Sequence, residues 1–259
     1  MNTKQTFENS VTEDYCSDKF TFNYNENSHK LDITPKNAKN VLNNNSELDL
    51  FEKQALEAYN EAFENYKPEE IAFCFDGGKD GHVVFHLLKN FLQRNKTLSN
   101  TIKDDSTEVC KTESKILTVN IIQNDTDLLA EPRELVKKLT EEYSSYIKYQ
   151  EYTNLDIKSA LYKLKDDHNG IKAIFMGVRR TDNVWYKSMT VFQKTDQGWP
   201  DYVRINPIVD WSYPCVWAYL LKYEIKYCAL YSAFKNTGLA VLIYFEFFYF
   251  FFVLGKEFH

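Results

Sequence analysis

The chain has 259 residues, a net charge of −6 and 26% charged residues, a composition that suits a globular protein with one main core. The acidic balance argues against a nucleic-acid surface, which would carry a basic patch or stripe. Five scattered cysteines without a CxxC pair argue against a disulfide framework and favour reduced thiols, so we expect a cytoplasmic protein.

The first 45 residues are rich in Asn, Ser, Thr and Lys and show no lasting apolar period, so we expect a disordered leader over 1–45. From Ser46 to Tyr66, apolar residues recur at three- and four-residue steps. This spacing predicts an amphipathic helix with Ser46 as its N-cap, and Pro68 lies just beyond its end.

Short apolar runs and helical patterns alternate after Pro68. The apolar runs predict strands over 71–75, 116–122, 146–152 and 171–177. The helical spacing predicts helices over 83–92, 132–143, 155–165 and 211–223, and the polar stretch 95–114 indicates a surface loop. The alternation predicts an α/β fold with a doubly wound, mostly parallel sheet and helices on both faces. Such sheets bind ligands at the carboxyl ends of their strands.

The first expected strand ends in the loop DGGKD, residues 76–80. Between a strand and a helix, main-chain N–H groups converge at the helix N-terminus and form an anion site. Gly77 and Gly78 let the backbone approach phosphate oxygens, Lys79 adds a positive charge, and Asp80 either caps the helix or helps to hold magnesium. The alternative is a tight turn with a solvated Lys79 and Asp80, and the loop alone does not decide between the two.

Two later segments favour the anion site. The segment IFMGVRRTD (174–182) ends an expected strand with two adjacent arginines, which are costly to hold together unless an anion lies beside them. The segment GWPDYVRINPIVDWSYPCVW (198–217) follows, with Arg204, Asn206 and Asp210 around a proline. A solvated loop is the alternative for each segment, but all three loops are expected at strand carboxyl ends.

The loop resembles the PP-loop of the ATP-pyrophosphatase superfamily. Together with GVRRTD, TDQGWP and RINPIVDWSYPCVW, it resembles the eukaryotic FAD synthases (FMN adenylyltransferases) of the phosphoadenylyl-sulfate-reductase-like type, over about residues 50–238. The resemblance implies an adenine nucleotide alpha-hydrolase-like fold for a domain over 46–238. It also implies the reaction of ATP with FMN to give FAD and pyrophosphate, with Mg²⁺, by a monomer.

The resemblance implies the site residues by position. Catalytic roles fall on Lys79, Asp80, Arg179 and Arg180, with Asp80 also as the magnesium ligand. ATP binding falls on Asp76, Gly77, Gly78, Lys79, Asp80, Thr118 and Asn120, with main-chain groups of 118–121 near the adenine. Flavin binding falls on Gly177, Arg179, Arg180, Thr181, Asp182, Trp199, Arg204, Asn206 and Asp210. For Trp199, packing in the core is the alternative.

The sequence departs from the family in two places that bear on activity. Asp76 stands where the family prefers Asn or Ser, and its carboxylate repels a polyphosphate unless magnesium or Lys79 lies between them. After residue 231, the family's turn and its arginine-bearing motif are not recognisable. The alternative function is therefore an inactive nucleotide- or flavin-binding protein. A sulfonucleotide reductase and a tRNA-thiolating enzyme are disfavoured, because their working cysteines are not seen.

The segment LAVLIYFEFFYFFFVL (239–254) admits three interpretations. As a membrane-anchoring helix it would span about 24 Å, short of the roughly 30 Å hydrocarbon core, and Glu246 lies inside it. As a core strand it is too long and too aromatic. We hypothesise the third interpretation, translated non-coding sequence from an A/T-rich gene, and a membrane partner is expected only if the tail is native.

Overall fold

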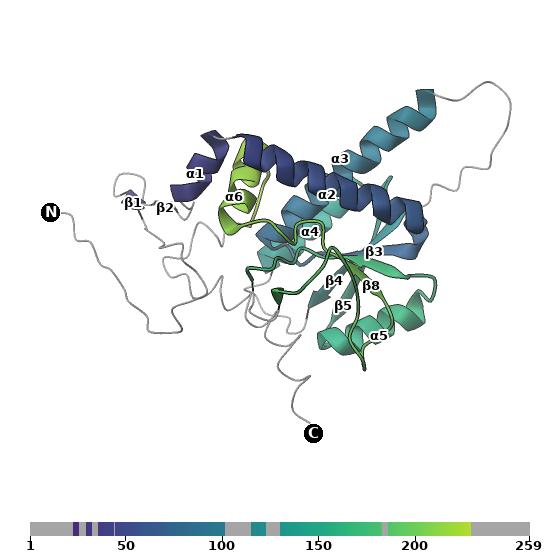
Figure 1. Ribbon diagram of the computed structural model, residues 1–259. Coiled ribbons are helices and arrows are strands. Elements are labelled where there is room, and N and C mark those ends of the chain that lie inside the picture. The colour runs from purple at the N-terminus through teal and green to yellow at the C-terminus, as the bar shows by residue number, and fades with distance from the viewer. Residues whose placement is uncertain are drawn as a thin grey trace.

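A central sheet carries several helices on one face and a single helix on the other (Figure 1). The computed structural model describes residues 23–25, 30–32, 36–43, 45–101, 115–122, 130–182 and 186–228. The helices are α1 (Lys36–Asn43), α2 (Asn45–Asn65), α3 (Lys79–Thr101), α4 (Ala130–Glu142), α5 (Ile157–Asp167) and α6 (Tyr213–Lys222), with a short 3-10 turn, η1, at Pro68–Glu70. The strands are β1 (Asn23–Asn25), β2 (Lys30–Asp32), β3 (Ile71–Cys74), β4 (Ile116–Ile122), β5 (Ile147–Thr153), β6 (Ala173–Phe175), β7 (Phe192–Lys194) and β8 (Val203–Ile205).

The main sheet has six strands in the order β5-β4-β3-β6-β8-β7. All neighbouring pairs are parallel except β7 with β8, while β1 and β2 form a separate antiparallel pair. The chain leaves β3 towards β4 and β5 on one side, then returns to place β6 on the other side of β3. The strand order therefore reverses between β3 and β6, and this is where doubly wound sheets open a ligand crevice.

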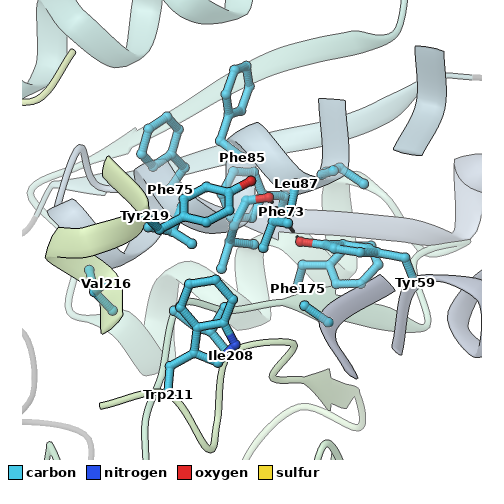
Figure 2. Close-up of a cluster of buried hydrophobic side chains, with 14 of the residues drawn as sticks. Tyr59, Phe73, Phe75, Phe85, Leu87, Phe175, Ile208, Trp211, Val216 and Tyr219 are labelled. Atoms are coloured by element: carbon cyan, nitrogen blue, oxygen red, sulfur yellow. Dashed lines mark hydrogen bonds between the residues drawn. The ribbon is translucent and has the colours of Figure 1, made fainter. Parts of the chain in front are cut away.

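The larger core fills the face of the sheet that is covered by α2, α3, α4 and α6. Aromatic rings from sheet and helices interlock there, as Figure 2 shows for Tyr59, Phe73, Phe75 and Phe175. The Tyr59 hydroxyl donates a hydrogen bond to the Val84 carbonyl oxygen (2.9 Å), so its polar end is paired inside the core. The Phe75 ring stacks on Phe85 of α3 with 5.5 Å between centroids, which fixes the start of α3 against the end of β3.

The opposite face of the sheet is covered by α5, which lies alone below the strands in Figure 1. The N-cap of α5 is Asp156, whose side chain accepts a hydrogen bond from the Ser159 main-chain N–H. The buried stripe of α5 includes Ile157, Leu161 and Leu164, at helical spacing. One short helix leaves part of this face uncovered towards the strand carboxyl ends, and the pocket described below lies there.

The fold class predicted from the sequence is confirmed, with differences at the margins. Residues 36–43, expected within a disordered leader, form α1, because Ala38 is buried against the larger core. Ser46 lies inside α2 rather than before it, and α3 continues to Thr101, into the expected surface loop. No helix in the described part of the chain is both long and apolar enough to cross a bilayer. The tail 239–254 lies outside the described residues.

Candidate active site

The DGGKD loop and the GVRRTD segment meet at the switch point of the sheet, after β3 and β6. Gly177 packs on the first turn of α3, where a Cβ added to it would lie 3.0 Å from the Asp80 carbonyl carbon. Gly77 has a φ of +84° and faces Pro132 of α4, where an added Cβ would meet Pro132 at 2.9 Å. Only glycine satisfies both the backbone angle and the close approach at Gly77.

The loop turns around the side chain of Asp76. The Gly78 main-chain N–H donates a hydrogen bond to Asp76 Oδ1 (2.9 Å), and the His82 N–H donates to the Gly78 carbonyl oxygen (3.0 Å). Burial raises the pKa of Asp76, and the nearby Asp80 acts in the same direction. A carboxylate of raised pKa therefore lies inside a loop whose shape suits an anion.

Four charged side chains form a buried network beside this loop. Lys79 Nζ lies 2.6 Å from Asp80 Oδ2, and Arg179 Nε lies 3.0 Å from Asp80 Oδ1. Arg179 Nη2 lies 2.5 Å from Asp182 Oδ1, and its main-chain N–H donates to Asp182 Oδ2 (2.8 Å). Lys79 and Arg179 are each 4% exposed and Asp80 is 1% exposed. The network thus alternates in sign, so each buried charge has an opposite neighbour.

The two adjacent arginines point in different directions. Arg180 Nε lies 2.5 Å from Asp210 Oδ1, and its Nη1 donates to the Met189 carbonyl oxygen. Its main-chain N–H donates to the Val209 carbonyl oxygen (2.8 Å). Arg179 therefore belongs to the buried network, whereas Arg180 and Asp210 connect two surface segments.

An open pocket, partly exposed to solvent, lies next to the loop. Asp76, Gly81 and Gly177 line it on the side of the loop. The other lining side chains are mostly apolar and come from β3, β4, α5, β6 and β8 and from the segments that follow β3, β6, β7 and β8: Cys74, Phe75, Val119, Ile121, Ile157, Leu161, Ile174, Met176, Val178, Tyr186, Met189, Thr195, Arg204 and Asn206. The pocket therefore joins a polar loop to an apolar slot.

Arg204 and Asn206 bring buried polar atoms to this slot. Both side chains are buried, and neither Arg204 Nε nor Asn206 Oδ1 has a hydrogen-bond partner among the described residues. The opposite ends of both side chains are held, because Arg204 Nη2 lies 3.8 Å from Asp196 and Asn206 Nδ2 donates to the Thr190 carbonyl oxygen (3.0 Å). Unpaired buried polar atoms are costly, so this pair suits a ligand with its own donors and acceptors.

Besides Arg180 and Asp210, four residues of the expected site belong neither to the loop and its charged network nor to the pocket lining: Thr118, Asn120, Thr181 and Trp199. Strand β4 alternates, so Val119 and Ile121 face the pocket while the Thr118 and Asn120 side chains do not line it. Trp199 packs against the core under α5, with Lys158 Nζ 5.8 Å from its ring centroid, and Thr181 is exposed.

The sequence interpretation passed over Tyr213, Tyr186 and Met189. The Tyr213 ring centroid lies 4.9 Å from Lys79 Nζ and 5.6 Å from Arg179 Cζ. Tyr186 and Met189 line the pocket from the turn that follows the GVRRTD segment. Tyr213 lies inside the DWSYP block (210–214), and this block was the sequence feature that could have drawn attention to it. No local pattern, however, shows which aromatic ring of the block faces the cations.

The two carboxylates of the loop differ in their fit to magnesium. Asp80 is held between Lys79 and Arg179, which disfavours a further cation at that carboxylate. Asp76 lines the pocket, and a Mg²⁺ ion is commonly held by one or two carboxylates together with substrate phosphates. In the described part of the chain, no three His, Cys, Asp or Glu side chains gather into a metal site. Of the two carboxylates, Asp76 is therefore the one placed to share a magnesium ion with a phosphate.

Comparison with known proteins places the chain in a family. The phosphoadenosine phosphosulfate reductase domain family matches residues 70–239, so the chain belongs to that family. Within it, the chain is 34% identical over 175 residues to the probable FAD synthase of Schizosaccharomyces pombe, covering 66% of this chain and 59% of that protein. It is 26% identical to the flavin adenine dinucleotide synthase of Saccharomyces cerevisiae, covering 65% of this chain and 56% of the relative. The resemblance to eukaryotic FAD synthases is thereby confirmed.

The fold has a solved counterpart in the same group. The FMN adenylyltransferase of Candida glabrata, solved in complex with FAD and inorganic pyrophosphate, superimposes with a TM-score of 0.60 at 23% identity. The superposition covers 71% of this chain and 60% of that protein. The chain thus spans somewhat more than half the length of these three relatives. It is a relative of nucleotidyltransferases that act on FMN, with an adenine nucleotide alpha-hydrolase-like fold.

Proposed function

We propose that this chain transfers AMP from ATP to FMN, giving FAD and pyrophosphate. The observation that carries the proposal is the meeting of the DGGKD loop and Arg179 at the switch point, beside a pocket with an apolar slot. Curated relatives that match two thirds of this chain are FAD synthases, which supports the same reaction.

The reaction is an in-line displacement at phosphorus. An oxygen of the FMN phosphate attacks the α-phosphorus of ATP and forms a new P–O bond. The bond from the α-phosphorus to the oxygen that bridges to the β-phosphate breaks, and pyrophosphate leaves with the electron pair. Because the protein makes no covalent bond, its contribution is to position the two substrates and to neutralise charge.

The residues divide this work by position. Lys79 and the N-terminus of α3 are suited to the departing pyrophosphate, and Arg179 to the phosphate that bridges the two substrates. Asp182 holds Arg179 in place through the contacts at 2.5 and 2.8 Å. The apolar slot between β4 and α5 suits the adenine, and the buried polar atoms of Arg204 and Asn206 suit the edge of the flavin. Magnesium, held by substrate phosphates and Asp76, would supply charge neutralisation at the leaving group.

A second candidate function is binding of the nucleotide or flavin without catalysis. Asp76 favours it, because a carboxylate in the anion loop opposes the polyphosphate. The two functions share one site, so FAD formation is the outcome that separates them.

The test mixes the full chain with FMN, ATP and magnesium and follows FAD by chromatography. Lys79→Ala removes the cation next to Asp80, and Lys53→Ala, at an exposed i,i+4 pair with Glu57, is the matched control. We expect FAD from the unaltered chain and from Lys53→Ala, and a loss of at least about a hundredfold in Lys79→Ala. Saturable FMN binding without FAD would instead establish the binding protein, and the absence of both activities would refute the site.

A further inference from the structure

Tyr213 places an aromatic ring over both cations of the buried network. Its ring centroid lies 4.9 Å from Lys79 Nζ and 5.6 Å from Arg179 Cζ. Both separations lie within the range of about 6 Å over which a cation is attracted to the face of an aromatic ring. The two cations come from loops about 100 residues apart, so this ring connects elements that the backbone does not join.

The position of Tyr213 is fixed by its own helix. It is the first residue of α6, directly after the N-cap Ser212, whose hydroxyl accepts a hydrogen bond from the Cys215 main-chain N–H (3.3 Å). Pro214 stiffens the same turn, and the Trp217 ring packs edge-on against Tyr213 with 6.2 Å between centroids. The ring is therefore held by a rigid helix start rather than by the cations themselves.

The ring adds to a network in which both cations contact one carboxylate. Asp80 contacts Lys79 with one oxygen and Arg179 with the other, and Asp182 pairs with Arg179 as well. The two cations therefore converge on Asp80 and repel each other there. The negative face of an aromatic ring adds attraction for both without adding a formal charge that would repel a polyphosphate.

We propose that Tyr213 is a positioning residue, which holds Lys79 and Arg179 side by side for a polyphosphate ligand. The proposal rests on the proposed function in so far as that ligand is the ATP triphosphate or the pyrophosphate product. Tyr213 acts through the two cations and does not itself take part in the chemistry. Its loss should therefore weaken binding of the charged part of the ligand and leave binding of the uncharged part intact.

The experiment measures inorganic pyrophosphate binding to the full chain by titration calorimetry. The variants are Tyr213→Phe, which keeps the ring face, Tyr213→Leu, which removes it, and Tyr213 replaced by trifluorophenylalanine, which keeps the shape but withdraws electrons from the face. We expect near-normal affinity for Tyr213→Phe and a loss of about three- to thirtyfold for Tyr213→Leu. The trifluoro variant should fall in between.

Two controls separate positioning from folding. Adenosine carries no phosphate, so its affinity should be the same in all four proteins. Tyr223→Leu removes an exposed ring that lies 5.1 Å from Lys222 Nζ and does not line the pocket, and it should bind pyrophosphate normally. Equal pyrophosphate affinity in Tyr213→Leu and the unaltered chain would overturn this inference and leave the proposed function standing. The same holds for equal losses of adenosine and pyrophosphate binding, or for full affinity of the trifluoro variant. If the unaltered chain bound no pyrophosphate, the proposed function and this inference would fail together.

Discussion

Gly177 and Asp80 are in backbone contact, although 97 residues separate them in the sequence: a Cβ on Gly177 would lie 3.0 Å from the Asp80 carbonyl carbon and 3.0 Å from the Gly81 nitrogen. The end of β6 therefore rests directly on the start of α3. This contact brings Arg179 within 3.0 Å of Asp80. The backbone of Gly177 does not adopt a positive φ. Close packing therefore explains why a glycine is needed in this segment.

Gly177→Ala should separate the two segments. The added methyl group meets backbone atoms that cannot rotate away, so we expect a loss of about 1–3 kcal/mol in the free energy of unfolding. Pyrophosphate affinity should fall as well, because Arg179 moves with the segment. Gly170→Ala is the matched control, as nothing lies within 4 Å of its added Cβ. Urea unfolding checks the prediction, and equal midpoints for the two variants would contradict it.

The adjacent arginines should differ strongly when each is removed. Arg179→Ala leaves the carboxylates of Asp80 and Asp182 buried without their shared cation, and we expect a loss of about 3–5 kcal/mol of stability. Arg180→Ala breaks a pair with the exposed Asp210, for which about 0–1 kcal/mol is typical, together with carbonyl contacts. Thermal unfolding of the two variants side by side measures the difference. A larger effect at Arg180 would mean that the buried network is not the stabilising one.

Asp76→Asn should strengthen anion binding when magnesium is absent. Asparagine has the same shape and its Oδ1 can still accept the Gly78 N–H, so the loop keeps its turn while one negative charge is lost. Removing one nearby like charge is expected to tighten pyrophosphate binding about tenfold in a chelator buffer. Magnesium should narrow this difference, because the ion screens Asp76 from the phosphate. Weaker binding by Asp76→Asn without magnesium would refute this account of the loop.

His82 should make the loop sensitive to acid. Its ring lies edge-on to Phe75, with 5.0 Å between centroids, and burial lowers its pKa from 6.5 to about 4 while a main-chain contact at Gly77 opposes the shift. The unfolded chain therefore binds a proton below pH 6.5 that the folded chain does not bind until about pH 4. Stability is fully present above pH 6.5 and is lost as the pH falls towards 4, by up to about 3 kcal/mol.

His82→Gln removes the titrating group and should flatten this part of the stability curve. Urea midpoints measured at intervals from pH 7.5 to pH 4 give the slope for each protein. Because other groups also titrate in this range, the informative quantity is the difference between the two slopes. Parallel curves would show that His82 does not carry the acid sensitivity.

A strand that forms a continuous, mostly apolar run could be predicted from the sequence. The run Ile116–Ile122 matches β4 residue for residue, because every side chain in it is buried and most of them are apolar. Strands β7 and β8 were missed, since three residues are too few to show a period. Helix α1 was missed for another reason. Its Asn-rich sequence has little apolar surface. The helix is stabilised by tertiary packing, because Ala38 is buried in the larger core.

The sequence by itself determined the order of the blocks and the chemistry of the DGGKD loop, because glycine, lysine and aspartate between a strand and a helix are local features. Tertiary structure alone decided that Arg179 enters the buried network while Arg180 pairs with Asp210. It also turned Val119 rather than Thr118 towards the pocket and placed the Tyr213 ring over two distant cations. The physical reason is that the direction of a side chain at a strand end depends on the register and packing of neighbouring elements, which no single segment encodes.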